Sequence, residues 1–335
     1  MRRIPVAFRA IEELQPGPIW AAVFAEQWPD HLAWFLQDGE RERPSYLDSV
    51  RMLRTHMPEL VPTYERLVEL AGGGDLAARV LSLVDPPPYL AACSQGAWTD
   101  GDPFLVRNYD YLADRVDGEI WHTAWTGRRV IGTGDSLWGL LDGLNEDGLA
   151  ISLTFGGRRL AGHGFGIPLV VRYLLETCAT VPEAEATLRR LPYHLAHNLT
   201  LLDREGRFAT AYLAPDREPV IARVAVATNH QDVADWPEYT ALTRSHERET
   251  LITRLLADPA VTPEAFADAF LVPPIFDSAG AGHFGTLYTA VLRPVEGAVE
   301  YRWPGFRWRL AFGAFEPGTH VELLAAGPDG PIAAG

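Results

Sequence analysis

The hydrophobic pattern of the chain changes near residue 89, and this change restricts its fold more than any other feature. Before it, residues 1 to 85 carry apolar positions at helical spacing, as in SYLDSVRMLRTHMPELVPTYERLVELAGGG, which ends at three glycines. After it come short apolar or alternating runs bounded by Gly, Asp or Pro, such as FLVRNYDYL, GLAISLTF and IARVAVATN. The first pattern predicts helices, and the second predicts strands joined by tight turns.

Helical patterns return between and after these strands. We expect helices over residues 167–178, 180–191, 238–258 and 262–271, and a hairpin that turns near Glu296 and Gly297. Helices that lie before, between and after runs of strands favour an α+β layered sandwich over a parallel nucleotide-binding sheet.

Composition restricts the partners of the chain. Its 335 residues are 47% hydrophobic, enough to bury a sizeable core, and its formal net charge is −15. This charge leaves no basic surplus for a nucleic acid or an anionic membrane surface, so we expect a small-molecule partner. Glu12, Glu13 and Pro16 interrupt the N-terminal segment before it reaches the length of a signal peptide, and no window resembles a membrane span.

The cysteines and histidines bear on compartment and cofactors. Two cysteines, Cys93 and Cys178, are too few for a disulfide framework, so a reducing cytoplasm is the predicted compartment. A single disulfide bridge between the two cysteines is an alternative that the sequence leaves open. His194 and His197 lie three residues apart, but Pro192 disrupts a shared helix face, and we expect neither a metal nor another cofactor.

Cys93 lies in the stretch PYLAACSQGAWTDGDPFLVRNYDY. A turn at TDGDP predicts a hairpin that brings Cys93 opposite the segment from Arg107 to Asp110. Strand alternation places Arg107 and Tyr109 on one face and Asn108 and Asp110 on the other. The thiol would then have a cation and a carboxylate as neighbours. A free cysteine in an apolar strand is most often a small buried hydrophobic residue, and that interpretation stays open here.

A series of motifs resembles a known family. Cys-Ser in a strand is followed by RNYDY, GLNEDGLAIS, GFGIP before a helix, HNLTLLDREG, ATNH, and an arginine in a long helix. In this order they resemble the N-terminal-nucleophile (Ntn) cysteine hydrolases, and most closely the acyl-coenzyme A:6-aminopenicillanic acid acyltransferase branch, the peptidase C45 group. Conjugated bile salt hydrolases, penicillin V acylase and acid ceramidase are more distant relatives. The resemblance runs from about Ala91 to Leu256.

The resemblance implies a fold and a mode of activation. The fold is a four-layer αββα sandwich of two antiparallel sheets, preceded by a helical N-terminal segment. Self-cleavage between Ala92 and Cys93 would divide one compact domain into segments 1–92 and 93–335, although Ala92 stands where the acyltransferases have glycine. The new α-amino group of Cys93 can serve as base for its own thiol. A free α-amine titrates near 8 and a thiol near 8.5, so the two exchange a proton readily at neutral pH.

The resemblance also assigns roles to five residues. Cys93 is the nucleophile and carries the amine base. Arg107 lies beside the sulfur and favours the thiolate, and Asp110 accepts a hydrogen bond from the Cys93 amine. Asn229 of ATNH donates to the oxyanion of the tetrahedral intermediate, and Arg248 supports the site.

Four further residues are expected to bind substrate or support the site: Asn108, Thr154, Asn198 and His230. Thr154 occupies the place of an asparagine in the bile salt hydrolases, so a second oxyanion donor there would be its hydroxyl or a backbone N–H. Asn198 fits the family pattern, and a structural role at a strand end is an equal alternative.

We therefore expect an amidohydrolase or acyltransferase that forms or cleaves an amide through an acyl-Cys93 intermediate. Its partner would be an N-acyl amide or an acyl donor such as acyl-coenzyme A, and a homo-oligomer is allowed. Two alternatives stay open: an unprocessed thiol hydrolase that uses Cys93 with His230, and a non-catalytic binding or scaffold protein with Cys93 buried. The sequence does not choose between hydrolase and transferase or specify the acyl and amine groups.

Overall fold

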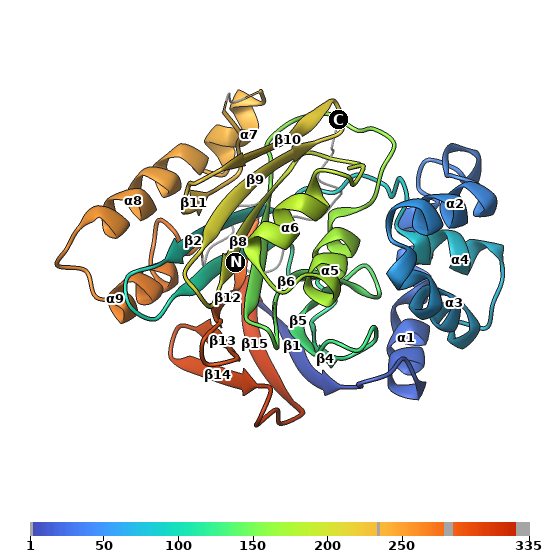
Figure 1. The fold of residues 1–335 in the computed structure, drawn as a ribbon, viewed down its shortest axis with the longest axis horizontal. Helices are drawn as coiled ribbons and strands as arrows, with labels where there is room; N and C mark the ends of the chain where they lie inside the picture. The colour runs from blue at the N-terminus through green and yellow to red at the C-terminus, as the bar shows by residue number, and fades with distance from the viewer. Residues whose placement is uncertain (1–2, 233–234, 278–283, 326–335) are drawn as a thin grey trace.

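Two β-sheets pack face to face at the centre of the computed structural model, which describes residues 3–232, 235–277 and 284–325 (Figure 1). Within these residues the larger sheet has nine strands in the order β10-β9-β8-β7-β6-β5-β4-β1-β15 and the smaller has six in the order β11-β2-β3-β12-β13-β14. The strands of the larger sheet are β1 (Arg3–Glu12), β4 (Glu119–Thr123), β5 (Val130–Asp135), β6 (Gly139–Asn145), β7 (Leu149–Phe155), β8 (His197–Asp203), β9 (Phe208–Ala214), β10 (Arg217–Ala222) and β15 (Gly318–Ala325). Those of the smaller sheet are β2 (Ala92–Trp98), β3 (Phe104–Tyr111), β11 (Val226–Ala227), β12 (Gly285–Arg293), β13 (Ala298–Trp303) and β14 (Phe306–Ala311).

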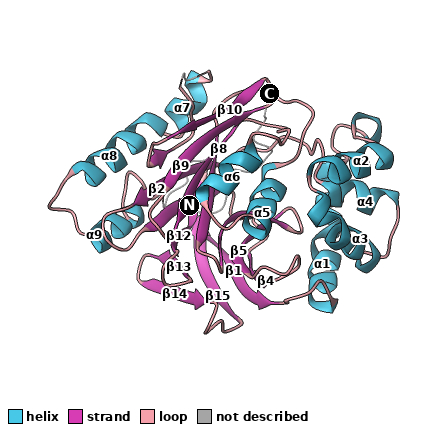
Figure 2. Ribbon diagram, viewed as in Figure 1, coloured by secondary structure: helices cyan, strands magenta, loops and turns pink. Residues whose placement is uncertain are grey.

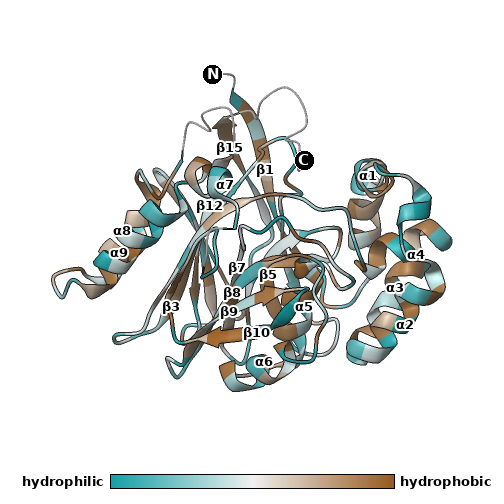
Figure 3. Ribbon diagram, turned by 90° about the horizontal axis from the view of Figure 1, so that it is seen from above, coloured by the Kyte–Doolittle hydropathy of each residue, from teal (hydrophilic) through white to brown (hydrophobic). Residues whose placement is uncertain are grey.

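Helices cover the outer faces of both sheets. The α-helices are α1 (Pro18–Phe35), α2 (Tyr46–His56), α3 (Val61–Leu70), α4 (Asp75–Ser82), α5 (Ile167–Thr177), α6 (Val181–Leu188), α7 (Pro237–Leu242), α8 (Ser245–Ala257) and α9 (Pro263–Asp268). α5 and α6 pack on the larger sheet, whereas α8 packs on β2 and β11 of the smaller one (Figure 2). In the view from above, the layers follow in this order: α8 and α9, the smaller sheet, the larger sheet, and α5 (Figure 3). Helices α1–α4 lie beside these layers. The predicted α+β sandwich is confirmed.

The prediction of helix for residues 1 to 85 is wrong at its start. Residues Arg3–Glu12 form β1, which pairs antiparallel with β15 and parallel with β4. Val6, Phe8 and Ala10 are buried, so the strand alternates inward and outward residues. Its partners come from distant parts of the chain, and for that reason the local pattern did not reveal it. The parallel pairing with β4 is also an exception in an otherwise antiparallel sheet.

The two cysteines are buried and free, so the bridge that the sequence left open is not formed. None of the helices in the described ranges is both long enough and apolar enough to cross a membrane.

The strand that carries Cys93 packs closely on the outer helices at Gly96. A Cβ atom there would lie 2.9 Å from Cζ of Phe266 and 3.1 Å from Cγ2 of Ile252, and both of these side chains are fully buried. We therefore expect Gly96→Ala to lower the free energy of unfolding by about 1–3 kcal/mol through overpacking. Chemical denaturation measures this change. An unchanged midpoint would show that the contact between β2 and the helices is looser than described.

Candidate active site

Cys93 is the second residue of β2 and lies at the centre of a buried polar network. β2 pairs antiparallel with β3, with Cys93 opposite Tyr109 and Ala92 opposite Asp110, so the predicted hairpin is confirmed. The Cys93 side chain is fully buried. The hairpin therefore brings the thiol, the bond before it and the polar residues of β3 together.

Arg107 of β3 reaches the thiol from the space between the two sheets. Its Nη2 lies 3.4 Å from Sγ of Cys93, and its Nε donates to the carbonyl of Leu153 at 3.0 Å. Nη1 contacts Asp142 of β6 and the hydroxyl of Tyr288, and neither Arg107 nor Asp142 is exposed. This buried ion pair fixes the guanidinium beside the sulfur, where the sequence predicted it.

Burial has the largest effect on the pKa of the Cys93 thiol. It raises the pKa of Cys93 above the usual value, while the positive charge of Arg107 counteracts part of this rise. In the continuous chain the thiol is therefore protonated at neutral pH, because the desolvation of a thiolate outweighs its attraction to Arg107. Arg107 lowers the pKa of the thiol, as expected, but not enough to offset burial, so nucleophilic attack requires a base.

The backbone nitrogen of Cys93 belongs to a second part of the network. Its N–H donates to Oδ1 of Asn229 at 2.8 Å, and Nη2 of Arg248 donates to the same oxygen at 2.8 Å. Nη1 of Arg248 donates to Asp110 at 2.9 Å and to the hydroxyl of Ser94 at 2.8 Å. Arg248 thus links the asparagine to the carboxylate.

Asp110 lies beside these groups, but its contacts differ from the expected one. Its two oxygens accept hydrogen bonds from Arg248 and from the hydroxyl of Thr286 at 2.6 Å. In the continuous chain the Cys93 N–H is directed to Asn229 instead. Burial raises the pKa of Asp110 to about 6, and the nearby Arg248 limits the rise.

The turn that holds Asn229 is fixed by two of the predicted support residues. Nδ2 of Asn198 donates to the carbonyls of Thr228 at 2.8 Å and His230 at 2.9 Å, and to Oγ1 of Thr154 at 3.1 Å. The Thr154 hydroxyl in turn donates to the Thr228 carbonyl at 2.7 Å. The Thr154 hydroxyl proton is therefore bonded to this carbonyl and not directed to the thiol. We infer that Thr154 and Asn198 position Asn229.

Asn108 does not face the thiol. Its Nδ2 donates to the carbonyls of Phe270 at 2.8 Å and Ile275 at 3.1 Å, and its Oδ1 accepts from Thr289. Strand alternation points it to the outer face of the sheet, where it anchors the segment that follows α9.

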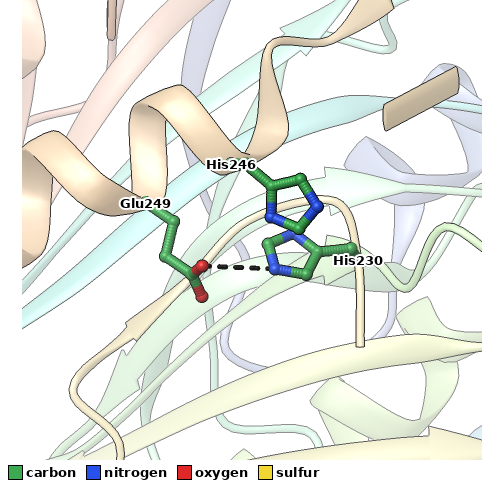
Figure 4. A group of neighbouring side chains, drawn as sticks. All are labelled: His230, His246 and Glu249. Atoms are coloured by element: carbon green, nitrogen blue, oxygen red, sulfur yellow. Dashed lines mark ion pairs between the residues drawn. The ribbon is translucent and has the colours of Figure 1, made fainter. Parts of the chain in front are cut away.

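His230 belongs to a cluster with two residues of α8 (Figure 4). One ligand atom from each of His230, His246 and Glu249 lies within 4.8 Å of the others, a set of donors that could hold a divalent transition metal. Nε2 of His230 lies 3.2 Å from Glu249, and Nδ1 lies 2.9 Å from the hydroxyl of Ser245. Both ring nitrogens therefore have partners other than Cys93, and the geometry does not pair Cys93 with His230.

Substitution of His230 separates the mechanisms. A general base contributes about a hundredfold to ten-thousandfold in rate, so a Cys93–His230 mechanism requires a loss of that size in His230→Ala. Because the ring faces Ser245 and Glu249, we expect a loss in kcat of no more than about tenfold. Steady-state assays measure this loss, and His246→Ala is the matched control for removing an imidazole from the cluster. A loss of a hundredfold confined to His230→Ala would restore the alternative mechanism.

Sequence reasoning missed five residues of the network: Ser94, Asp142, Tyr239, Thr286 and Tyr288. Asp142 was visible as an acidic residue within the apolar run WGLLDGLN, which indicates a buried charge with a partner. The hydroxyl of Tyr239 donates to the carbonyl of Ala91 at 2.5 Å, and nothing in its local sequence indicates this contact.

Comparison with solved structures finds chains of low sequence identity. One is a mutant of the conjugated bile acid hydrolase from Clostridium perfringens, 13% identical, with a TM-score of 0.44 and coverage of 68% of this chain and 96% of that one. Another is penicillin V acylase from Agrobacterium tumefaciens, 15% identical, with a TM-score of 0.49 and coverage of 66% and 86%. A third is the Caenorhabditis elegans ortholog of N-acylethanolamine-hydrolyzing acid amidase, 14% identical, with a TM-score of 0.46 and coverage of 61% and 93%.

No curated protein matches the chain by sequence. A family match exists, however, to acyl-coenzyme A:6-aminopenicillanic acid acyl-transferase, and it covers residues 98–308. This match begins just after Cys93 and includes Arg107, Asp110, Asn229 and Arg248. Because it covers more than half of the sequence, the chain belongs to the acyl-coenzyme A:6-aminopenicillanic acid acyl-transferase family.

Proposed function

We propose that this protein is a self-processed cysteine amidohydrolase or acyltransferase whose acyl-enzyme forms on Cys93. The observation that carries the proposal is the environment of one residue: Arg107 lies 3.4 Å from the Cys93 sulfur, while Asn229 holds the nitrogen of that same residue at 2.8 Å. The match to an acyl-transferase family agrees with this chemistry.

Activation would begin at the bond between Ala92 and Cys93. The Cys93 sulfur attacks the Ala92 carbonyl carbon, the thiol proton passes to the Cys93 nitrogen as the C–N bond breaks, and the acyl group moves from nitrogen to sulfur. Water then hydrolyses this thioester, which leaves a carboxylate on Ala92 and a free amine and thiol on Cys93. The cut would divide the chain into segments 1–92 and 93–335.

The new amine supplies the base that the network otherwise lacks. Because burial keeps the thiol protonated, attack on an amide requires a group that removes its proton. The α-amine would accept this proton and pass it to the leaving amine of the substrate, which produces an acyl thioester on Cys93. Water or a second amine would then release the acyl group, and this choice distinguishes hydrolase from transferase.

Two donors support a site for the oxyanion. The Tyr239 hydroxyl, and Nδ2 of Asn229 at 3.3 Å, both face the carbonyl oxygen of Ala91, which lies on the segment that the cut would release. Departure of that segment would free both donors for the oxygen of a tetrahedral intermediate. Arg248 and Asn198 would hold Asn229 in this position.

This proposal predicts a measurable contribution from Tyr239. We expect Tyr239→Phe to lower kcat by about tenfold to a hundredfold with a small change in KM, because the hydroxyl would act on the transition state. Steady-state kinetics measure kcat and KM separately, and Tyr212→Phe is the matched control because Tyr212 lies outside the network. A change confined to KM would assign Tyr239 to ground-state binding.

The experiment that tests the proposed processing is intact-mass analysis of the purified protein. The expected result is two fragments that join at Ala92 and Cys93, with Cys93→Ala remaining one chain. A full-length wild-type chain that turns over amides would remove the mechanism based on the terminal amine.

A further inference from the structure

A large cavity lies next to the proposed site. Its volume is about 940 Å³, and residues of α1, the segment 88–90, the segment that follows β3, and the end of β5 line it. Leu90, Tyr111, Leu112 and Phe284 of its wall also pack in the hydrophobic cluster that contains Ala92. The cavity wall therefore shares side chains with the cluster around the scissile bond, and Leu90 among them belongs to the segment before the cut.

The charge of the cavity wall is strongly negative. Six acidic residues line it, namely Glu26, Asp30, Asp38, Asp114, Asp117 and Asp135, against two arginines and His31. Arg9 is already paired with Glu26 and Glu119, and His31 with Asp117. Asp30 and Asp114 form no ion pair within the part of the chain that the structure describes, so their charge is available to a ligand.

Asp135 is the most enclosed of these acids. Its carboxylate accepts a hydrogen bond from Ser136, and burial together with the negative charge of Asp117 raises the pKa of Asp135 to about 7. His31 and Arg107 oppose this rise only in part, so a cationic group in the cavity would stabilise the charged form of Asp135.

Aromatic rings form the wall that leads from the cavity toward Cys93. The ring centroids of Trp34 and Tyr89 are 6.5 Å apart, those of Tyr89 and Tyr111 6.4 Å, and those of Tyr111 and Phe284 6.4 Å. The Tyr89 hydroxyl is buried and has no hydrogen-bond partner in the described ranges, so it leaves a polar atom for a ligand to satisfy. Aromatic faces beside carboxylates are the surroundings that bind ammonium groups.

We propose that this cavity binds substrates that carry a positive charge, and that the preferred substrate class is N-acyl amides bearing an ammonium group several atoms from the scissile bond. The reaction rests on the function proposed above, whereas the charge preference of the cavity does not. Carboxylate-bearing amides would be repelled by the same acidic wall.

Binding of three matched probes to full-length Cys93→Ala tests the cavity without turnover. The probes share a phenylacetyl group joined by an amide to a four-carbon chain, and they end in an ammonium, a hydroxyl or a carboxylate. We expect calorimetry to show affinity at least about tenfold higher for the ammonium probe than for the hydroxyl probe, with the carboxylate probe weakest. Equal affinities, a preference for the carboxylate, or no binding of the ammonium probe would overturn the proposal.

Two variants in the Cys93→Ala background connect the preference to the cavity. Asp30→Asn and Asp114→Asn, which change two exposed acids of the wall, should each reduce the preference for the ammonium probe by at least about threefold, because each removes one negative charge from the wall. Asp102→Asn, an exposed acid outside the cavity, is the control for net charge and should leave the preference unchanged. Equal effects of all three variants would show that the preference comes from the charge of the whole molecule.

A separate assay distinguishes the two proposals. If wild-type protein turns over none of the three probes while Cys93→Ala still prefers the ammonium probe, the proposed reaction fails and the cavity inference stands. If all three are turned over at similar kcat/KM and bind equally, the reaction stands and the cavity inference fails.

Discussion

Cys93→Ala is expected to abolish both self-cleavage and turnover. The substitution removes the only sulfur that contacts Arg107 in the described residues, and with it the atom that would attack the Ala92 carbonyl and the substrate amide. Alanine fits the same strand position, and the buried site loses a single atom, so the fold should persist at a small cost in stability. Intact-mass analysis and an amidase assay measure the two losses.

Cys178→Ala is the matched control for this prediction. Cys178 is also free and buried, but it contacts Thr177 and Thr187 and lies outside the network. We expect this variant to be cleaved and to turn over substrate like the wild type. Retention of activity in Cys93→Ala, or its loss in Cys178→Ala, would contradict the assignment of the nucleophile.

Arg107→Met should be the most damaging substitution for stability in the network. It leaves Asp142 buried without its cation, and breaking a buried ion pair in this way lowers the free energy of unfolding by about 3–5 kcal/mol. The hydroxyls of Thr133 and Tyr288 still donate hydrogen bonds to the Asp142 carboxylate, but these bonds do not neutralise its charge. The variant should also be inactive, because the thiol loses the positive charge that opposes the rise in its pKa. Denaturant titration and kinetics measure the two effects.

The double variant Arg107→Met/Asp142→Asn separates structure from chemistry. Replacing the carboxylate by an amide removes the unpaired charge and keeps one acceptor oxygen, for the hydroxyl of either Thr133 or Tyr288. We expect most of the stability to return while activity stays lost. Recovery of activity in the double variant would show that Arg107 acts by holding the fold and not by its charge at the sulfur.

Local patterns were sufficient to predict the site's framework. The turn at TDGDP and the alternation in FLVRNYDY placed Cys93 opposite β3 and separated Arg107 from Asn108 correctly. These features depend on residues a few positions apart in one hairpin. The order of motifs extended the prediction to Asn229 and Arg248, which the structure brings to the Cys93 nitrogen and to Asp110.

Other features depend on contacts between distant segments. β1 forms only because β4 and β15 flank it, and its pairing energy is invisible in residues 3–12 alone. The hydrogen bond from the Cys93 nitrogen reaches Asn229, 136 residues later in the chain, instead of Asp110 on the neighbouring strand. The acidic cavity combines residues from α1, β5 and the segment that follows β3, none of which forms a motif by itself.

The most direct test of the account is the site and mass of an acyl adduct. Wild-type protein would be incubated with an N-acyl amide that it turns over, quenched in acid and mapped by mass spectrometry. We expect a hydroxylamine-sensitive acyl group on the sulfur of Cys93, in a fragment that begins at Cys93 with a free α-amine. An acyl group on another residue, or on Cys93 in a chain still joined to Ala92, would contradict it.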